Sequence, residues 1–246
     1  MDLKDRVALI TGAKRIGVVV ATELARRGVD VALSYNRSKP EAEKAAVAIK
    51  DLGRRVFIKQ ANLTNAEECA ALVTATVAAL GRLDILINMA SIYVQKPLDT
   101  LTVEEWDENI AVDLRAAFLC SRAAVPHMRL IGGGRIINFS DWLSRSGRPR
   151  YTGFLPYYVA KTAVIGLTEG LALEYAPDRI LVNAIAPGPI LAPPQTTDEE
   201  LKAVETATPL GHWGGEMAIA EAVIALLGCD FVTGETIRVD GGRHVK

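Results

Sequence analysis

Short apolar segments alternate with longer amphipathic segments along most of the chain. Stretches of helical length lie between the apolar segments, for example residues 18–27, 40–52 and 66–80. Strands that are continuously apolar are usually covered on both faces, and regular alternation with helices favours a parallel, doubly wound sheet. The pattern predicts an α/β fold, a single-domain Rossmann-type doubly wound parallel sheet of about seven strands with helices on both faces. The predicted strands are residues 7–11, 30–35, 55–60, 84–88, 135–140, 180–186 and 236–240.

One region interrupts this alternation. Four prolines fall between Pro187 and Pro194, in a segment that the pattern leaves irregular. Long irregular connections inside a compact domain are uncommon and often act as lids. In an open parallel sheet the ligand binds beyond the carboxyl ends of the strands, where this segment begins. We expect a substrate-covering loop at residues 187–215, and the alternative is a plain structural loop.

Composition narrows the class of protein. Half of the 246 residues are apolar, so the chain can bury a large core. Its 28 basic and 29 acidic residues leave a net charge of -1, and the absence of a long basic block argues against a nucleic-acid partner. The cysteines Cys69, Cys120 and Cys229 lack metal-like spacing, so we expect buried thiols and no metal site. No apolar run of about 18 residues occurs, so we expect a cytoplasmic protein without a membrane partner.

A glycine turn follows the first predicted strand. The sequence TGAKRIG places Gly12 and Gly17 on either side of Lys14 and Arg15, and a helix is predicted from about Val18. Such a turn at a helix amino end offers backbone amides and a partial positive charge to a diphosphate. Two glycines depart in number and spacing from G-x-G-x-x-G, but the position between first strand and first helix is that of a dinucleotide site.

The end of the second predicted strand indicates which dinucleotide binds. NAD-specific sites carry an acidic residue there, whereas this chain has Asn36, Arg37 and Ser38. A guanidinium holds a phosphate through paired hydrogen bonds, so Arg37 suits the additional phosphate of NADP(H). The alternative is that Arg37 is a solvated loop charge. We therefore expect residues 1–246 to form one NADP(H)-binding Rossmann domain.

The segment after the fifth predicted strand carries candidate acid–base chemistry. Tyr157 and Lys161 are four residues apart, so on a helix they lie on the same face. A neighbouring ammonium favours the phenolate, and Lys161 is therefore expected to lower the pKa of Tyr157. The strand ends in Ser140 and Asp141, and Ser144 follows, so each of these three could complete a reactive group.

These motifs occur in an order that resembles the short-chain dehydrogenase/reductase family. The chain has the glycine turn, Asn88 after the fourth strand, the Tyr157 and Lys161 pair, and Pro187 followed by Gly188. The resemblance covers almost the whole length, to the tail TGETIRVDGG. It implies an oxidoreductase in which Tyr157 donates the proton and Lys161 also bonds the nicotinamide ribose.

Within that family the details are most similar to pteridine reductases. Arg15 stands in place of the central glycine, the run after the fourth strand reads Asn88-x-Ala90-Ser91, and Asp141 stands where most relatives carry the catalytic serine. This resemblance implies NADPH-dependent hydride transfer to a pteridine-type substrate, a dihydropterin or a dihydrofolate-like ring. Asp141 would then act with the tyrosine in protonating the ring, because a carboxylate suits a substrate that presents N–H donors.

The resemblance assigns residues to each site. The cofactor is expected on Gly12, Lys14, Arg15, Ile16, Asn36, Arg37, Ser38, Asn62, Leu63, Asn88, Ala90, Lys161, Pro187, Gly188 and Ile190. The substrate is expected on Arg15, Ser91, Tyr93, Asp141 and Tyr157. Tyr93 would stack on the substrate ring, although it could instead belong to the lid core, and Arg15 could bind phosphate alone. Asp113 departs from the family's asparagine in the fourth helix, so the proton relay works differently or Asn109 serves instead.

Other readings remain open from the sequence. The helix that starts at Tyr157 is apolar nearly all round and contains Ala163, Gly166 and Gly170, so it is buried either within the fold or against another subunit. The family resemblance implies pairing through this helix, and we expect a homo-oligomer, a dimer or tetramer. The chain could be a carbonyl reductase acting on a ketone, sugar or acyl thioester. It could also sense NADPH without turnover, although Tyr157 and Lys161 count against this. The sequence leaves the natural substrate and the direction of the reaction open.

Overall fold

The protein forms one seven-stranded parallel sheet. The computed structural model describes residues 1–12, 14–146, 152–193 and 195–245. The strand order is β3-β2-β1-β4-β5-β6-β7, with every neighbouring pair parallel, so the predicted fold class is confirmed. The strands are β1 Val7–Thr11, β2 Asp30–Tyr35, β3 Val56–Gln60, β4 Ile85–Asn88, β5 Gly134–Phe139, β6 Ile180–Pro187 and β7 Thr236–Val239.

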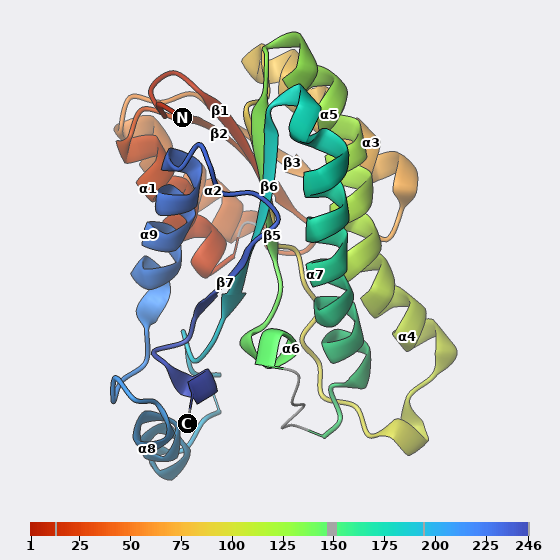
Figure 1. Ribbon diagram of the computed structural model, residues 1–246, viewed down its shortest axis with the longest axis vertical. Coiled ribbons are helices and arrows are strands. Elements are labelled where there is room, and N and C mark those ends of the chain that lie inside the picture. The colour runs from red at the N-terminus through yellow and green to blue at the C-terminus, as the bar shows by residue number, and fades with distance from the viewer. Residues whose placement is uncertain (13, 147–151, 194, 246) are drawn as a thin grey trace.

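Helices cover both faces of this sheet (Figure 1). One layer contains α1 Ile16–Arg26, α2 Lys39–Asp51 and α9 Gly215–Gly228. The other contains α3 Ala66–Leu80, α4 Val103–Ile110, the π turn η2 Ala111–Arg115, α5 Ala116–Leu130 and α7 Leu155–Tyr175. The shorter elements are η1 Leu98–Thr100, α6 Trp142–Ser146, η3 Ala176–Asp178, α8 Asp198–Ala207 and η4 Arg243–Val245. Among the described residues, no helix combines the length and apolarity needed to cross a membrane.

Each face of the sheet packs against its own apolar core. Val20 and Leu24 of α1 and Val223 of α9 belong to one core. Leu72 of α3 and Met128 of α5 belong to the other. Because the central strands are buried on both faces, they need apolar residues at consecutive positions, which explains the continuous runs in the sequence.

The amino-terminal edge of the sheet is held by buried carboxylates. Asp84, just before β4, accepts from Arg82 Nε at 2.8 Å and from the backbone amide of Val7 at 2.9 Å. Asp30, the first residue of β2, pairs with Arg54 at 2.9 Å and Arg55 at 2.7 Å. Asp30 and Asp84 are 4% and 1% exposed. Removing a partner from such a pair is costly, so these contacts bind the strands together at the edge opposite their carboxyl ends.

Several predicted boundaries and environments differ from the structure. Helix α7 begins at Leu155 rather than Tyr157, because Pro156 fits the first turn of a helix. The segment at residues 187–215 contains α8, which a capping box at Thr197 and Glu200 starts, so the expectation of an irregular loop throughout was wrong. Pro194 lies outside the described residues. Cys229 is only half-buried, in contrast to the buried Cys69 and Cys120.

Candidate active site

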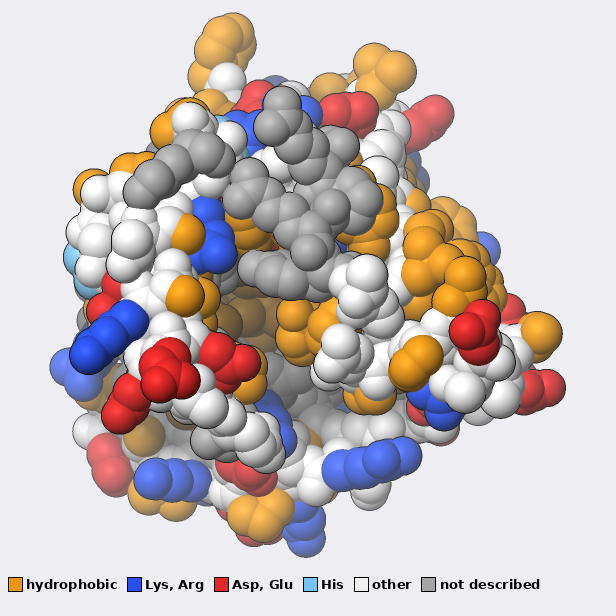
Figure 2. Space-filling view, turned by 90° about the horizontal axis from the view of Figure 1, so that it is seen from below, with side chains coloured by type: hydrophobic (Ala, Val, Ile, Leu, Met, Phe, Trp, Pro, Cys, Tyr) orange, Lys and Arg blue, Asp and Glu red, His pale blue; other side chains and the backbone are white. Residues whose placement is uncertain are grey.

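The carboxyl ends of the central strands open into a hollow. Figure 2 views the molecule from below, toward the lower end of Figure 1, and shows hydrophobic side chains in the depth of the hollow with charged side chains around its rim. The glycine turn follows β1 here, and the segment that contains Ser91 and Tyr93 follows β4. Asp141 follows β5 at the same edge. This is the edge at which parallel α/β sheets bind their ligands.

The glycine turn is closely packed against the start of α1. Gly12 has φ +92°, a conformation that favours glycine. A Cβ on Gly17 would lie 2.2 Å from the carbonyl oxygen of Gly12, so no side chain fits there. In the part of the chain that the structure describes, no side chain caps the first turn of α1, and Lys14 and Arg15 beside it are exposed. An uncapped helix amino end beside a glycine turn and two cations fits a diphosphate.

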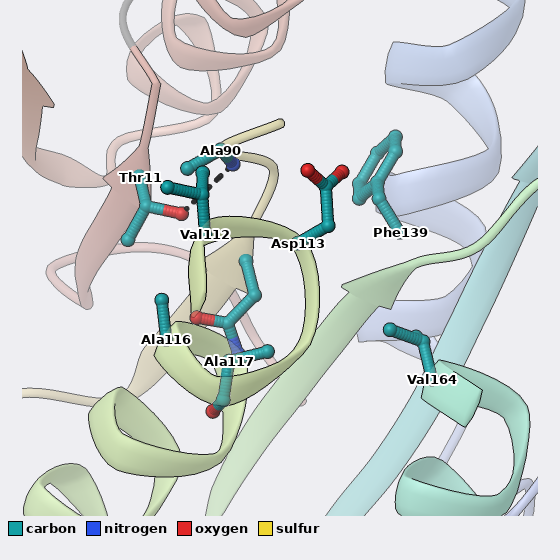
Figure 3. A pocket seen from close by; sticks show the side chains of 9 residues that line it. Thr11, Ala90, Val112, Asp113, Ala116, Ala117, Phe139 and Val164 are labelled. Carbon is teal, nitrogen blue, oxygen red and sulfur yellow. Dashed lines mark hydrogen bonds between the residues drawn. The ribbon is translucent and has the colours of Figure 1, made fainter. Parts of the chain in front are cut away.

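Thr11 joins this turn to the segment after β4. Its hydroxyl oxygen accepts from the backbone amides of Met89 at 3.0 Å and Ala90 at 3.2 Å, and the second bond is drawn in Figure 3. The side chain of Asn88 points into the core, where Nδ2 donates to Asn138 Oδ1 at 2.9 Å. Asn88 therefore anchors the segment that lines the hollow. Thr11 is a site residue that was not predicted from the sequence, although its place at a strand end directly before the glycine turn was a usable signal.

The segment after β2 leaves the candidate phosphate-binding residues at the surface. Asn36 and Arg37 are exposed, and within the described part of the chain Arg37 makes no ion pair. Asn62, expected to bond the adenine, has a different contact, because its Oδ1 accepts from the amide of Thr64 at 3.1 Å and its hydroxyl at 2.9 Å. The expected neighbour Leu63 is buried. Arg37 is thus available to a ligand, whereas the Asn62 carbonyl oxygen is already engaged.

Asp141 is the candidate third residue that contacts the tyrosine. The hydroxyl of Tyr157 donates to Asp141 Oδ2 at 3.0 Å, and Asp141 Oδ1 accepts from the amide of Leu143 at 2.8 Å at the start of α6. Ser140 is buried, and its hydroxyl donates to the backbone carbonyl of Lys161 at 2.8 Å. Ser144 is buried within α6, where its hydroxyl has no hydrogen-bond partner in the described structure. The geometry therefore brings Asp141, and neither serine, to the tyrosine hydroxyl.

Lys161 forms a buried ion pair with Asp113. Its Nζ lies 3.1 Å from Asp113 Oδ1 and donates to the Phe139 carbonyl at 3.0 Å. The lysine side chain is 4% exposed and the aspartate side chain is fully buried. The ammonium is 5.6 Å from the ring centre of Tyr157. Lys161 thus forms an ion pair with the carboxylate and lies within cation–π distance of the tyrosine ring.

A π turn places Asp113 in this position. Residues Ala111–Arg115 form the extra-wide turn, and Figure 3 shows Asp113 projecting from it. Its other contacts are the Ser91 hydroxyl and the Ile92 amide, which donates at 2.9 Å. Asn109 instead donates to the Ile92 carbonyl at 3.0 Å and holds the segment after β4. A cavity of about 10 Å³ beside Asp113 is close to the space of one water molecule.

The electrostatics of this group differ from the sequence-based expectation. Burial raises the pKa of Tyr157 well above its ordinary value, and the negative charges of Asp141 and Asp113 raise that pKa further. The net direction of the Tyr157 pKa shift is therefore opposite to the sequence-based expectation, because burial and the two carboxyl groups outweigh the ammonium of Lys161. Burial also raises the pKa of Asp141, while hydrogen bonds from Leu143 and Tyr157 and the charge of Lys161 act against this rise. Both groups are thus biased toward their protonated forms.

Aromatic residues form one wall of the hollow beside Tyr157. The ring of Tyr93 stacks on Phe154 with centres 4.5 Å apart and meets Tyr157 edge-on at 4.8 Å. Tyr93 is 54% exposed, so part of its ring remains accessible. Phe154 was missed in the sequence because it belongs to no strand or helix pattern and stands just before α7.

The loop after β6 is tied to both sides of the site. Gly188, which follows Pro187, donates its amide to the Val239 carbonyl at 2.9 Å, and a Cβ there would lie 2.4 Å from the Cβ of Asp240. Ile190 is buried in the core beside α1 and α9. Arg15 crosses from the glycine turn to the Ala192 carbonyl at 3.3 Å. The expected covering loop is thus connected to the turn that is expected to bind the cofactor.

The fold and the geometry of this site together indicate the class of protein. A parallel sheet with a glycine turn after its first strand and a tyrosine–lysine pair at its carboxyl edge has the layout of a nicotinamide-dependent oxidoreductase. The chain belongs to the short-chain dehydrogenase/reductase family: residues 12–244 match the family described as Enoyl-(Acyl carrier protein) reductase.

Individual relatives agree with this assignment. The chain is 38% identical over 244 residues to 3-oxoacyl-[acyl-carrier-protein] reductase FabG of Staphylococcus aureus, covering 97% of this chain and 98% of the relative. A short-chain dehydrogenase/reductase from Serratia marcescens superposes with a TM-score of 0.91 at 30% identity, covering 99% and 100% of the two chains. A blue fluorescent protein from a metagenomic library, solved in complex with NADPH, reaches 0.91 at 31% identity, covering 99% of each chain. These relatives do not specifically support the pteridine branch, and reduction of an acyl or ketone group fits them better.

Proposed function

We propose that this protein is an NADPH-dependent carbonyl reductase that converts a ketone, such as a 3-oxoacyl thioester, to a secondary alcohol. The observation that carries the proposal is the Tyr157 hydroxyl, which faces Asp141 at 3.0 Å with the Lys161 ammonium beside its ring. A tyrosine hydroxyl positioned in this way can act as the general acid that protonates the substrate oxygen. The 38% identity to 3-oxoacyl-[acyl-carrier-protein] reductase supports this substrate class.

The residues of the chain divide the work of the reaction. When bound, the nicotinamide supplies the hydride. Tyr157 donates a proton to the carbonyl oxygen as negative charge develops there. The Asp113 carboxylate and the Phe139 carbonyl hold the Lys161 ammonium in place, and the stacked rings of Tyr93 and Phe154 lie beside Tyr157.

The cofactor fits the residues at the glycine turn. The backbone amide of Ile16, at the first position of α1, is suited to the diphosphate, with Lys14 beside it, whereas the Gly12 amide already donates to the Ser34 carbonyl at 3.2 Å. No acidic residue occupies positions 36–38, and the exposed Arg37 suits a ribose phosphate. A structural relative was solved with NADPH, which supports the same preference here.

Replacing Arg37 with alanine is expected to raise the KM for NADPH while leaving that for NADH nearly unchanged. Hydrogen bonds to charged groups contribute about 1.5–3 kcal/mol, which corresponds to roughly 10- to 100-fold in KM. Steady-state kinetics with both cofactors measure this, and Lys44→Ala, an exposed cation on α2, is the matched control. Equal effects on both cofactors would contradict a phosphate contact.

The protonation state of Asp141 determines whether the site stabilises or repels the negative charge that develops on a carbonyl oxygen. An ionised carboxylate 3.0 Å from Tyr157 repels the negative charge that develops on the substrate oxygen, whereas a protonated carboxyl donates a second hydrogen bond to it. A carboxylic acid kept neutral by burial is known to serve this role. The pKa of Asp141 is raised by burial, which is the direction that the donor role requires.

The carbonyl activity is therefore expected to fall as the pH rises through the raised pKa of Asp141. The protonated form is the active donor, so kcat/KM is highest below that pKa and lower above it. In Asp141→Ser the hydroxyl stays protonated, so this decline should disappear and activity at neutral pH should equal or exceed that of the wild type. Profiles of kcat/KM against pH for both proteins test this, and an identical decline in the serine variant would assign it to another group.

Reduction of a pteridine ring is the second candidate, favoured by the contact between Asp141 and Tyr157. An ionised Asp141 would accept hydrogen bonds from the N–H groups of a pterin. NADPH oxidation with a 3-oxoacyl thioester and, separately, dihydrobiopterin distinguishes the two substrates. Turnover of the thioester alone supports carbonyl reduction. Turnover of the pterin that Asp141→Ser abolishes supports the second candidate.

The outer face of α7 supports self-association. Gly166 and Gly170 are exposed with open space around them, and Leu173 on the same helix is 80% exposed. Small residues allow a second helix to approach closely, and an exposed leucine gains from burial. We therefore include a homo-oligomer, formed through this helix, in the proposal.

A further inference from the structure

We propose that Asp113 is a positioning residue that neutralises Lys161 and thereby keeps Tyr157 in its protonated, proton-donating form, which favours the site for reduction over oxidation. Tyr157 is the acid when a carbonyl is reduced and must be a phenolate base when an alcohol is oxidised. The ionisation of this one hydroxyl therefore sets the pH range in which each direction runs. The effect on direction rests on the proposed carbonyl chemistry, whereas the effect on ionisation does not.

The geometry shows why Lys161 favours Asp113. The Asp113 carboxylate lies 3.1 Å from the ammonium, whereas the Tyr157 ring centre is 5.6 Å away. Both members of the ion pair are almost completely buried, so solvent screens their attraction little. An ammonium that is compensated at this distance offers little further stabilisation to a phenolate.

The carboxyl groups near Tyr157 both disfavour ionisation of its hydroxyl. Asp141 lies against the hydroxyl from the end of β5, Asp113 lies beyond Lys161 on the π turn, and Tyr93 contacts the ring edge-on. Lys161 is the single cation among these described neighbours, set against two carboxyl groups. Ionising Tyr157 would add another negative charge to a buried cluster whose one positive charge is already paired.

The contacts of Asp113 fix it in this role. The Ser91 hydroxyl donates to the same Asp113 oxygen that faces Lys161, and the Ile92 amide donates to the other oxygen at 2.9 Å, so both carboxylate oxygens are engaged. An asparagine has nearly the same shape and could accept from Ile92, but it has no charge for the ammonium. Replacing the aspartate with asparagine therefore changes mainly the electrostatic potential at Tyr157.

The test is the ionisation of Tyr157 followed directly by NMR of protein labelled at the tyrosine ζ-carbon. Six tyrosines are present, and Tyr157→Phe identifies the resonance of interest. In the wild type this tyrosine should remain protonated above the ordinary value of about 10. In Asp113→Asn its midpoint should fall by at least about one pH unit, a tenfold rise in the ionisation constant. Asp107→Asn, which removes an exposed charge six residues earlier in α4, should leave the midpoint unchanged.

A wild-type midpoint at or below about 10, or an unchanged midpoint in Asp113→Asn, would overturn the proposal. Removing one partner of a buried pair costs roughly 3–5 kcal/mol, so the double variant Asp113→Asn, Lys161→Met serves as a second test that leaves no unpaired charge. It should keep Tyr157 protonated as in the wild type, and a lower midpoint would contradict a neutral pair.

Kinetic measurements test whether Asp113 also affects the balance between reduction and oxidation. The rates of ketone reduction and of alcohol oxidation are measured as functions of pH. In Asp113→Asn, the pH at which the oxidation rate rises and the pH at which the reduction rate falls should both decrease by the same amount as the NMR midpoint. Absence of any turnover would contradict the proposed carbonyl function, while the NMR titration would still decide the role of Asp113. A shifted midpoint with unshifted kinetic profiles would overturn the effect on direction.

Discussion

Replacing Tyr157 with phenylalanine is expected to lower kcat for carbonyl reduction by about 10²- to 10⁴-fold, the range that a positioned proton donor contributes. Phenylalanine retains the ring that packs edge-on against Tyr93 at 4.8 Å, so the wall of the hollow should remain. The hydroxyl that donates to Asp141 is lost. NADPH affinity should stay within about threefold, because the expected cofactor contact is Lys161.

The adjacent Tyr158 provides the matched control. Tyr158→Phe removes a hydroxyl one residue away on the same helix, but on a different face. Its kcat should remain close to that of the wild type. Single-turnover measurements with NADPH distinguish a slower chemical step from slower product release. Substantial residual activity in Tyr157→Phe, or equal losses in both variants, would exclude Tyr157 as the proton donor.

Replacing Gly17 with alanine is expected to abolish NADPH binding over the usual concentration range and to destabilise the fold. Its Cβ would lie 2.2 Å from the Gly12 carbonyl oxygen, a backbone atom that cannot move without shifting the whole turn. Forcing extra volume into a packed site costs about 1–3 kcal/mol. The free energy of unfolding by urea and NADPH binding by fluorescence measure the two effects.

Gly228, at the end of α9, provides the comparison for Gly17. Apart from its own chain neighbours and helix backbone, no atom of the described residues lies within 4 Å of a Cβ built on it. Gly228→Ala should leave cofactor binding unchanged and the free energy of unfolding unchanged or raised by up to about 1 kcal/mol. Unaltered NADPH affinity in Gly17→Ala would contradict the assignment of this turn to the cofactor.

The sequence predicted the sheet because burial on both faces leaves a strong local signature. The runs at residues 7–11 and 30–35 coincide with β1 and β2, and the run at residues 66–80 coincides with α3. Helix α8 was not predicted, because its polar sequence packs few apolar residues and prolines precede it. Leu201 and Val204 do follow helical spacing, but the pattern extends over only 10 residues.

The site was predictable where chemistry follows local spacing and unpredictable where it depends on tertiary contacts. The four-residue spacing of Tyr157 and Lys161 was enough to place them together, and the contact of Asp141 with Tyr157 agrees with the family pattern. The ion pair between Asp113 and Lys161 joins residues 48 positions apart through a π turn that no sequence pattern indicated. The direction of the Tyr157 pKa shift follows from burial first and from the charges of Asp141 and Asp113 second, so it could not be predicted from the motif.

The buried carboxylates Asp30 and Asp84 and the reactive group around Tyr157 occupy opposite edges of one sheet. Effects of substitutions at distant sites without shared partners usually add. Substitutions in the hollow that lower the free energy of unfolding can therefore be compensated by stabilising substitutions at the opposite end of the strands. A fold that separates its structural anchors from its chemistry in this way tolerates repeated exchange of substrates, which gives one chain architecture a wide range of evolutionary descendants.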